Sequence, residues 1–411
     1  MTDNTLILGE GKYFNMDCHK TKLNNNVLIV GASGSGKTRS FVIPNLIQAT
    51  GSYVISDPKG NLYRKYGAWL EKKGYLVKRL DFTKPLVSER YNLFRYIHDE
   101  QDIVKLAHML IGTEKNYSKD PFWDESAQLL VQAILAYLWE KNDTDKQNLH
   151  YVLELLRKSK ALEDMITDKS ELDSIMETHR KLNNNSYACR TYDKVRVSPD
   201  VTLRSIIVTA TARLGIYDIP ELNKMMEDDD LNITSLGEKK TALFVVVSDS
   251  DRSMDTLADL FFTQAINELS TYADKCCKNN CLPVPVRFIL DDFATNCRIH
   301  EFPRMISSIR SRGISVMLMI QAESQLTEYY GNDGNTIIAN CDSYVYLGGN
   351  DLQTAQYVAE RCNVPIKKIL YMPVGTNWVF RRGELPYNGK NCDLDKFIKD
   401  KCQGDVPKSL A

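Results

Sequence analysis

The sequence predicts an α/β protein with a mostly parallel, twisted sheet flanked by helices, and three observations indicate this fold class. Short apolar runs that suit buried strands alternate with helical stretches over roughly the first 80 residues. The same alternation resumes near residue 240 and continues to about residue 380. Between these regions, apolar residues recur at helical spacing and no convincing strand is present. Alternating strands and helices favour parallel strands joined by crossover helices, and the middle stretch indicates an all-α insertion.

The predicted strands share a short run of apolar residues bounded by polar or glycine-containing segments. In chain order they are Leu6–Gly9 (a possible edge strand), Val27–Val30, Ser52–Ser56, Tyr75–Leu80, Ala242–Val247, Val286–Leu290, Ile314–Ile320, Ser343–Leu347 and Thr376–Phe380. The predicted helices share apolar residues three or four positions apart. They are Ser40–Ile47, Asn61–Lys73, Leu106–Ile111, Ser126–Trp139, Tyr151–Arg157, Val201–Leu214, Met254–Ala273, Phe302–Arg310 and Leu352–Arg361.

The strand Val27–Val30 runs into Gly31-Ala32-Ser33-Gly34-Ser35-Gly36-Lys37-Thr38, which fits the phosphate-binding loop pattern G-x-x-x-x-G-K-[ST] at every fixed position. Glycines let backbone N–H groups surround a phosphate, and the start of the next helix adds partial positive charge. We expect Lys37 to reach the β- and γ-phosphates and Thr38 to place its hydroxyl on Mg²⁺. A chance match is disfavoured because a strand precedes the loop and a helix follows it. The residues expected to contact the nucleotide are Ser33, Gly34, Ser35, Gly36, Lys37, Thr38 and Arg39.

The motif and the strand pattern together divide the chain into three segments. Residues 1–97 are expected to form the first part of a nucleotide-binding domain, which contains the loop. Residues 98–200 are expected to form an inserted all-α subdomain. Residues 201–411 are expected to form the second part of the nucleotide-binding domain, and the helix Val201–Leu214 to return the chain to the sheet.

Two acids, Asp291 and Asp292, follow the apolar strand Val286–Leu290 directly. In enzymes with a phosphate-binding loop, an aspartate at a strand end holds Mg²⁺, and we assign this role to Asp291. The next acid can polarise the attacking water, which makes Asp292 the candidate catalytic base. Two solvated acids at a strand end would be the alternative, but the phosphate-binding loop upstream favours the catalytic interpretation.

Arg304, Arg310 and Arg312 follow on a predicted helix and its exit. A guanidinium from this segment could stabilise transition-state charge, either in the same chain or across a subunit boundary. A solvated helix face remains an equal alternative for each arginine. Gln321 ends the next apolar strand, where a polar side chain can sense the γ-phosphate. The predicted catalytic residues are therefore Lys37, Asp292, Arg310 and Gln321.

Composition limits the remaining classes of function. The chain has 411 residues, 43% hydrophobic residues and a net charge of −1, so no overall basic excess indicates nucleic-acid binding. No apolar run approaches the ~20 residues of a membrane helix, and the N-terminus does not look like a secretory signal. Of the ten cysteines, only Cys276, Cys277 and Cys281 cluster, with a spacing unlike that of a zinc site. We expect a soluble cytosolic protein with reduced thiols.

In several segments the chain resembles the type IV secretion coupling proteins, the TraG/TraD-type ATPases of bacterial conjugation. The resemblance extends from about Asn26 to Pro386, and the stretch Asp57–Tyr63, similar to a D-P-K-G-E-x-x box, is specific to it. The other segments that carry it are the phosphate-binding loop followed by Ile43-Pro44, Leu290–Ala294 (similar to an L-D-E-F box), Ser311–Ala322 (similar to R-x-x-G-I…Q) and Gly349-Asn350-Asp351.

The resemblance implies a RecA-like P-loop NTPase that hydrolyses ATP with Mg²⁺ and carries an inserted all-α subdomain for docking and gating. It implies a homo-hexameric ring in which an arginine of one subunit meets ATP bound at the next, with Arg310 as the best match and Arg312 second. The implied partners are a relaxase–DNA complex or a secreted protein, the ATPases of the secretion channel and its inner-membrane components. The implied location is the cytosolic face of the bacterial inner membrane.

This sequence departs from the family pattern in two places. Asp292 stands where the family usually has Glu, so we expect slower hydrolysis or the help of a second acid. The membrane-spanning helices with which family members usually begin are absent, which suggests either a trimmed cytosolic domain or a separate anchor polypeptide. Without membrane tethering we expect a monomer in dilute solution.

Two alternatives stay open beside the coupling ATPase. A DNA-pumping ATPase of the FtsK/HerA kind would share the core and the ring, but its pore loops should be basic. The predicted insert carries Arg157, Lys158, Lys160 and Arg190 together with many acids, so its DNA binding is weakly supported. A nucleotide-gated docking adaptor that scarcely hydrolyses ATP is the second alternative, and Asp292 leaves room for it.

Overall fold

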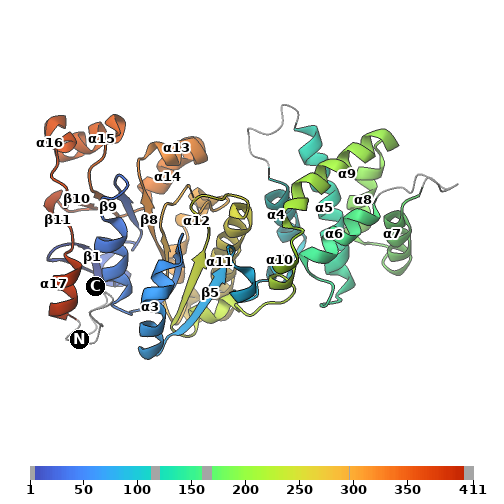
Figure 1. Ribbon diagram of the computed structural model, residues 1–411, viewed down its shortest axis with the longest axis horizontal. Helices are drawn as coiled ribbons and strands as arrows, with labels where there is room; N and C mark the ends of the chain where they lie inside the picture. Colours follow the sequence, from blue (N-terminus) through green and yellow to red (C-terminus); the bar gives the residue numbers. More distant parts are fainter. Residues whose placement is uncertain (1–4, 113–120, 160–168, 296, 402–411) are drawn as a thin grey trace. The chain divides into compact units, whose positions relative to one another are not determined.

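The computed structural model describes residues 5–112, 121–159, 169–295 and 297–401 (Figure 1). The chain divides into two compact units. The first comprises residues 1–79, 232–252 and 265–411, and the second comprises residues 80–231 and 253–264. The long helix α11 (Asp255–Cys276) begins in the second unit and ends in the first.

The first unit is built on a nine-stranded sheet in the order β11-β10-β9-β3-β8-β7-β4-β6-β5, accompanied by a two-stranded sheet, β1-β2. β3 pairs in parallel with β8 and β9, and β4 and β7 continue the parallel arrangement. β10 and β11 add an antiparallel edge. The strands are β1 (Thr5–Gly9), β2 (Lys12–Asn15), β3 (Val27–Val30), β4 (Ser52–Ser56), β5 (Leu76–Asp81), β6 (Thr241–Val246), β7 (Val286–Leu290), β8 (Ile314–Ile320), β9 (Ser343–Tyr346), β10 (Thr376–Arg381) and β11 (Tyr387–Lys390).

The predicted fold class, a mostly parallel sheet flanked by helices, is confirmed. Two strands were not predicted, β2 and β11, because each has only four residues that alternate between half-buried and exposed positions. Such short polar segments lack the apolar run by which the other strands were recognised. β1 was predicted, but it pairs with β2 and not with the main sheet.

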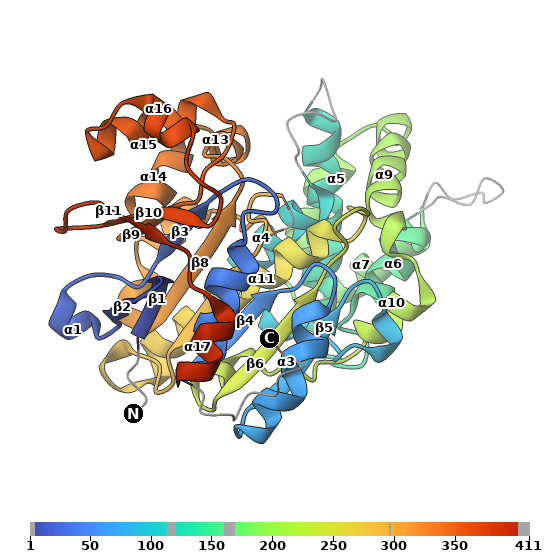
Figure 2. The same ribbon diagram turned by 60° about the vertical axis from the view of Figure 1, so that its left-hand side comes forward.

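The central strand β3 is buried on both faces, which is typical of a parallel sheet between two helical layers. All four of its residues are fully buried. Val27 and Ile29 point to the face where Phe41, Leu62 and Phe397 complete a hydrophobic cluster. These three side chains come from segments far apart in the chain, and the helix α17, red in Figure 2, packs against α2.

The helices of the first unit cover the sheet and connect its parallel strands. Both ribbon views draw α13 to α16, orange to red, together at the top of the unit (Figures 1 and 2). The predicted helix 302–310 is divided into α12 and the 3₁₀ turn η7 (Ile309–Arg312). The α-helices are α1 (Cys18–Thr21), α2 (Ile43–Leu46), α3 (Asn61–Lys72), α12 (Phe302–Ile306), α13 (Ser324–Tyr330), α14 (Gly334–Ala339), α15 (Leu352–Cys362), α16 (Ile366–Leu370) and α17 (Leu394–Lys401).

The second unit is helical from α4 to α10 and extends beyond the expected range 98–200. The helix predicted to return to the sheet is α9, and it packs instead against α5 and α6. An ion pair of 3.0 Å between Arg213 of α9 and Asp124 of α5 supports this packing. Periodicity identifies a helix but not its partner, so the boundary could not be predicted. The helices are α4 (Glu100–Ile111), α5 (Phe122–Lys141), α6 (Leu149–Lys158), α7 (Glu171–Leu182), α8 (Tyr187–Arg196), α9 (Asp200–Leu214) and α10 (Pro220–Met225).

Candidate active site

The loop Gly31–Thr38 leaves the carboxyl end of β3 and is anchored by both neighbouring strands. The N–H of Gly31 donates to the Ile320 carbonyl at the end of β8, at 3.1 Å. The N–H of Ala32 donates to the Gly348 carbonyl beyond β9, also at 3.1 Å. These two contacts fix the start of the loop at the edge of the sheet where ligands of open α/β folds bind.

The loop depends on glycine at particular positions. Gly34 and Gly36 have φ angles of 76° and 88°, which residues other than glycine rarely adopt. A Cβ atom on Gly31 would lie 2.7 Å from the Ser35 Oγ. This Oγ is buried and has no hydrogen-bond partner. Because buried hydroxyl groups are normally paired, Ser35 indicates a missing ligand, and a phosphate oxygen fits it.

Lys37 folds back onto the loop. Its Nζ donates to the Gly31 carbonyl at 2.7 Å and to the Ala32 carbonyl at 3.3 Å, and the side chain is buried. Burial lowers the pKa of the Lys37 ammonium group, and the carboxylates of Asp292 and Asp291 oppose this lowering. The ammonium group therefore lies within the loop, where a phosphate could replace its carbonyl partners.

The structure brings Thr38 and Asp291 together, as the sequence predicted. Thr38 begins the π-helical turn η1 (Thr38–Val42), and its Oγ1 donates to Asp291 Oδ2 at 2.7 Å. Burial raises the pKa of the Asp291 carboxyl, while the hydrogen bond from Thr38 acts in the opposite direction. A hydroxyl and a carboxylate this close offer the hard oxygen ligands that suit Mg²⁺.

Asp292 follows with an unusual backbone. Its φ is 51°, an uncommon value for a residue other than glycine, and its N–H donates to Asp291 Oδ1 at 3.1 Å. The next N–H, of Phe293, bonds to the Met319 carbonyl of β8 at 2.8 Å. The strand end is therefore turned sharply, which gives Asp292 a direction different from that of Asp291. Such conformations are concentrated at functional sites.

Gln321 lies beside the loop. It follows β8 immediately, and Ile320 is paired with Val30 at the end of β3. Its backbone N–H donates to Gln325 Oε1 at 2.8 Å and is therefore already paired, while its side chain is exposed. Gln321 therefore follows the same end of the parallel strands as Gly31, and its contact with a γ-phosphate stays a prediction.

Arg310 lies at the amino ends of the parallel strands, whereas the loop lies at their carboxyl ends. It belongs to η7, which precedes β8, whereas Lys37 follows the carboxyl end of the parallel strand β3. Its Nη2 donates to the Cys18 carbonyl at 3.3 Å, and its side chain is exposed. The seven residues of β8 separate the two edges by roughly 23 Å. Within one chain, Arg310 therefore does not reach the loop.

Arg312 is engaged elsewhere. Its Nε and Nη2 donate to both carboxylate oxygens of Asp274, at 2.9 and 2.7 Å, and its Nη1 donates to the Ser308 carbonyl. A bidentate pair of this kind fixes a guanidinium in place. Of the two arginines, Arg310 is consequently the one whose guanidinium is freer to contact another subunit.

Arg39 points away from the loop, toward the end of the chain. Its Nη2 donates to both Asp395 oxygens of α17, at 3.0 and 2.9 Å. Ser33 and Gly34 are exposed at the tip of the loop. The predicted contacts of Ser33, Gly34 and Arg39 with a nucleotide stay predictions.

Two further residues near the loop were not among the predicted site residues. Asp57 follows β4, which lies next to β7, and its buried carboxylate accepts the Tyr63 N–H at 2.8 Å. Its position after a strand was the signal that could have placed it near Asp291. Asn391 donates to the Ser35 carbonyl at 3.4 Å from the far end of the chain, and no local pattern could have indicated that contact.

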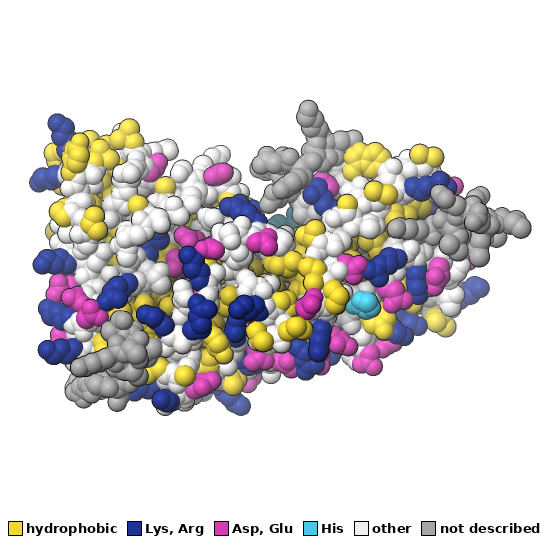
Figure 3. All heavy atoms as spheres, viewed as in Figure 1, with side chains coloured by type: hydrophobic (Ala, Val, Ile, Leu, Met, Phe, Trp, Pro, Cys, Tyr) yellow, Lys and Arg dark blue, Asp and Glu magenta, His cyan; other side chains and the backbone are white. Residues whose placement is uncertain are grey.

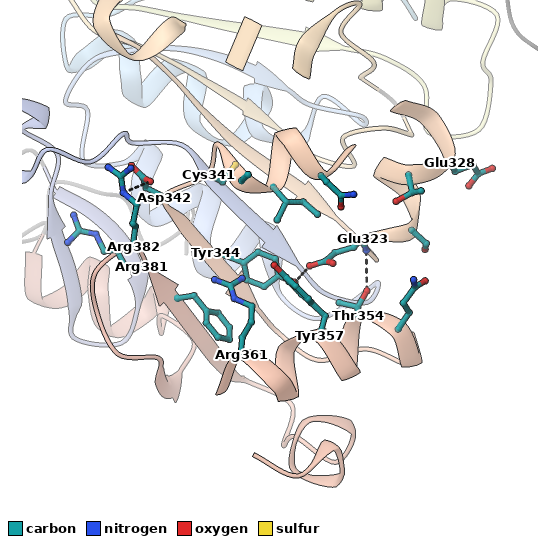
Figure 4. Close-up of a pocket in the computed structure, with 17 residues that line it drawn as sticks. Glu323, Glu328, Cys341, Asp342, Tyr344, Thr354, Tyr357, Arg361, Arg381 and Arg382 are labelled. Atoms are coloured by element: carbon teal, nitrogen blue, oxygen red, sulfur yellow. Dashed lines mark hydrogen bonds and ion pairs between the residues drawn. The ribbon is translucent and has the colours of Figure 1, made fainter. Parts of the chain in front are cut away.

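A groove of about 860 Å³ lies apart from the loop, between α13, α14, α15 and the strands β9 and β10 (Figure 4). In it the Arg361 guanidinium lies 4.2 Å from the Phe380 ring centre, and Glu323 accepts the Tyr344 hydroxyl at 2.7 Å. None of the predicted site residues lines this groove. The residues to which the sequence assigned chemistry therefore lie outside this groove.

Comparison with known proteins identifies the family of the chain. The sequence pattern of the family described as "Type IV secretory system Conjugative DNA transfer" matches residues 2–363. The chain belongs to this family. It is 22% identical to the type IV secretion system-coupling protein VirD4 of Bartonella henselae over 362 residues, which cover 85% of this chain and 54% of the relative. It is 24% identical to the conjugal transfer protein TraG of Escherichia coli over 356 residues, which cover 82% of this chain and 54% of the relative.

The members of this family that the chain matches are longer than it, since it spans about half the length of these curated relatives. Among solved structures, the bacterial conjugative coupling protein TrwBdeltaN70 superposes with a TM-score of 0.70 at 17% identity, covering 95% of this chain and 89% of that one. The structure of TrwB with ADPNP superposes with a TM-score of 0.67 at 15% identity, covering 94% of this chain and 88% of that one. The structure of TrwB with ADP and Mg²⁺ superposes with a TM-score of 0.65 at 15% identity, covering 94% of this chain and 89% of that one. The likeness confirms the RecA-like P-loop NTPase fold.

Proposed function

We propose that the chain is an ATP-hydrolysing coupling protein that brings relaxase–DNA complexes or secreted proteins to a type IV secretion channel and energises their transfer. The observation that carries the proposal is the contact between Thr38 and Asp291 beside the buried Lys37. It joins the two halves of a nucleotide site at the carboxyl edge of the sheet. Family membership supports the transport role, and the nucleotide complexes of TrwB support the substrate.

The residues present fit Mg²⁺ and a triphosphate. Thr38 and Asp291 would hold the ion, which supplies charge neutralisation to the phosphate oxygens when it is bound. Among the residues that the structure describes, no cluster of three or more His, Cys, Asp or Glu side chains could hold a metal. This agrees with a magnesium site in which one carboxylate, one hydroxyl and the substrate provide the ligands.

The remaining side chains divide the chemistry of hydrolysis among them. The Lys37 ammonium group would exchange its carbonyl partners for β- and γ-phosphate oxygens. Asp292 would orient a water molecule and accept its proton as the water oxygen bonds to the γ-phosphorus and the bond to the β-phosphate oxygen breaks. Gln321 would hydrogen-bond to the γ-phosphate and sense its departure.

Arg310 would act on the neighbouring subunit of a homo-hexameric ring. Its guanidinium is exposed and forms no ion pair with any residue that the structure describes. It lies at the amino end of β8, opposite to the end of the strands that carries the loop of its own chain. A ring would supply an arginine to each loop from outside, which is a known way to stabilise charge in phosphoryl transfer. In dilute solution we expect a monomer.

The proposed place of action is the cytosolic face of the bacterial inner membrane, beside the ATPases and inner-membrane components of the channel. In the part of the chain that the structure describes, no helix combines the length and the apolar character needed to cross a membrane. An anchor, in the same polypeptide or a separate one, would hold the ring there.

Contact with DNA has limited support in the surface. Figure 3 shows Lys and Arg side chains gathered over α3, with acidic side chains among them. The exposed basic residues of α3 and its end are Arg64, Lys65, Lys72 and Lys73. This mixed surface favours neither the coupling protein nor a FtsK/HerA-like DNA pump. A nucleotide-gated adaptor with little hydrolysis is favoured by one feature, the short side chain of Asp292 on a strained backbone.

The test is the ATPase rate of the full chain against protein concentration, with and without single-stranded DNA, and with Lys37→Ala as the inactive control. A rate per subunit that rises steeply with concentration supports a ring that completes its site between subunits. A rate near zero at all concentrations, with ATP binding that Lys37→Ala removes, supports the adaptor. Hydrolysis that Lys37→Ala leaves unchanged would contradict the proposed site.

A further inference from the structure

The strand β7 buries an arginine that has no acidic partner among the residues that the structure describes. The Arg287 side chain is 5% exposed, and its neighbours across the sheet are Tyr53 of β4 and Ser315 of β8. Its Nε donates to Ser315 Oγ at 3.3 Å, and its Nη2 reaches only the Met16 sulfur at 3.5 Å. Its Nη1 has no hydrogen-bond acceptor among the described residues.

The charge of this guanidinium is not neutralised by the side chains around it. Burial lowers the pKa of Arg287 to about 10, so the group stays charged at neutral pH. The ionisable groups that act on its pKa are Tyr53 and Cys18, and neither is a carboxylate. Buried charges in proteins are normally paired, because an isolated ion loses its hydration without compensation.

A small cavity adjoins Arg287 at the amino-terminal edge of the sheet. Its volume is about 20 Å³, and none of the described residues that line it is acidic. A cavity of this size holds one particle a little larger than a water molecule. Gln48, Thr50 and Tyr53 share the lining with Arg287, although most of the lining surface is apolar.

We propose that this cavity binds a small monovalent anion of the size of chloride as the counter-ion of Arg287. A water molecule would satisfy the free N–H groups but would leave the charge uncompensated. Thr5 and Met16, which also line the cavity, belong to the first hairpin and the segment after it. The bound anion therefore holds this part of the chain against β7.

The anion site goes beyond the proposed function and is separate from the nucleotide site. Arg287 and Asp291 belong to the same strand and its end, four positions apart, so roughly 13 Å of extended chain divides them. Cys18 follows Met16 closely in the segment that the anion would hold, and its carbonyl accepts a hydrogen bond from Arg310. Binding at this site can be measured without nucleotide, so its failure would leave the ATPase proposal untouched.

The test is the melting temperature of the full nucleotide-free chain as sodium gluconate is replaced by sodium chloride at constant ionic strength. We expect a rise of about 2–4 °C over a hundredfold range of chloride for the wild type and for the control Arg382→Met. Arg382, whose side chain is exposed and pairs with the buried Asp342, does not line this cavity. Arg287→Met should show no chloride response. A wild type that is equally stable in both salts would contradict the proposal.

A second measurement does not require the variant to fold. Crystals of the wild type grown in bromide should show an anomalous peak beside the Arg287 guanidinium, and density without anomalous signal would identify water and overturn the proposal. Asp3 lies outside the described residues, and Asp3→Asn tests a carboxylate of this chain as the counter-ion. If the wild type ignores chloride but Asp3→Asn responds to it, the site belongs to that carboxylate and not to a free anion.

Discussion

The Thr38 hydroxyl donates a hydrogen bond of 2.7 Å to the Asp291 carboxylate across a separation of 253 residues. The phosphate-binding loop and the acidic strand end therefore meet at one pair of oxygen atoms, although the helical unit intervenes in the sequence. This contact is arranged as two neighbouring ligands of one magnesium ion would be. The two partners of this hydrogen bond can be tested separately. Serine at position 38 keeps the hydroxyl, and asparagine at position 291 keeps the shape of the carboxylate without its charge.

Thr38→Ala should reduce the affinity for ATP in the presence of Mg²⁺ by about 10- to 100-fold, because it removes an oxygen ligand worth ~1.5–3 kcal/mol. Binding measured with EDTA should change little. Thr38→Ser is the matched control, since it keeps the hydroxyl, and it should retain most of the magnesium-dependent affinity. Equal losses with and without Mg²⁺ would mean that Thr38 shapes the loop and does not bind the metal.

Asp291→Asn should raise the melting temperature of the nucleotide-free protein at pH 7 by about 1–3 °C. Burial raises the folded-state pKa of Asp291 above 3.8, so the folded state favours the protonated form. Asp291 therefore contributes most to the stability of the wild type below pH 3.8, where it is protonated in both states. This stabilisation is lost as the pH rises through the raised pKa of the folded state. The asparagine variant should lack that decrease and should also lose magnesium-dependent ATP binding. A lower melting temperature at pH 7 would show that the carboxylate itself supports the fold.

Arg310→Ala should keep its nucleotide affinity in dilute solution and lose about 10³-fold or more of its turnover under assembling conditions. The sharper experiment mixes two inactive variants, Arg310→Ala and Lys37→Ala. In a mixed ring, a Lys37→Ala subunit supplies its intact arginine to the intact loop of an Arg310→Ala subunit, so activity should partly return. Arg312→Ala, which breaks the ion pair with Asp274, is the control and should keep most of its turnover on its own, because its Lys37 and Arg310 are intact. Mixtures that stay inactive would indicate that Arg310 does not act across the boundary.

The sequence predicted those features that depend on a local pattern. The loop, the buried strands and the acids after β7 were recognised from a few adjacent residues, and the parallel sheet then brought Thr38 and Asp291 together. The direction of Arg39 could not be predicted, because its partner Asp395 stands 356 residues later. The extent of the helical unit was also missed, since helical periodicity does not reveal that α9 packs on α5. Buried but unpaired Arg287 looked like an ordinary strand residue.

The ion pair between Arg39 and Asp395 tests the predicted nucleotide contact of Arg39. Both side chains are more than half exposed, at 54% and 63%, so breaking the pair should change stability by less than about 1 kcal/mol. If the guanidinium moves to the nucleotide on binding, Asp395→Asn should strengthen ATP binding by about 2- to 5-fold, because the carboxylate no longer competes. Arg39→Gln should weaken binding, and Asp395→Asn should have no effect in that background. Unchanged affinity in both single variants would remove Arg39 from the site.

Replacing Asp292 tests whether the site hydrolyses ATP or only binds it. The backbone at this position has a φ of 51°, which asparagine tolerates well, so Asp292→Asn should fold normally while it removes the proton acceptor. Its turnover should fall by about 10²- to 10⁴-fold with ATP affinity nearly unchanged. Asp292→Glu restores the residue type of the resembling family and extends the carboxylate by one methylene. Faster turnover in the glutamate variant, measured by phosphate release at saturating ATP, would mean that the short side chain limits the wild-type rate. If both variants hydrolyse ATP like the wild type, the base is another group, and the buried carboxylate of Asp57 after β4 is the next to replace.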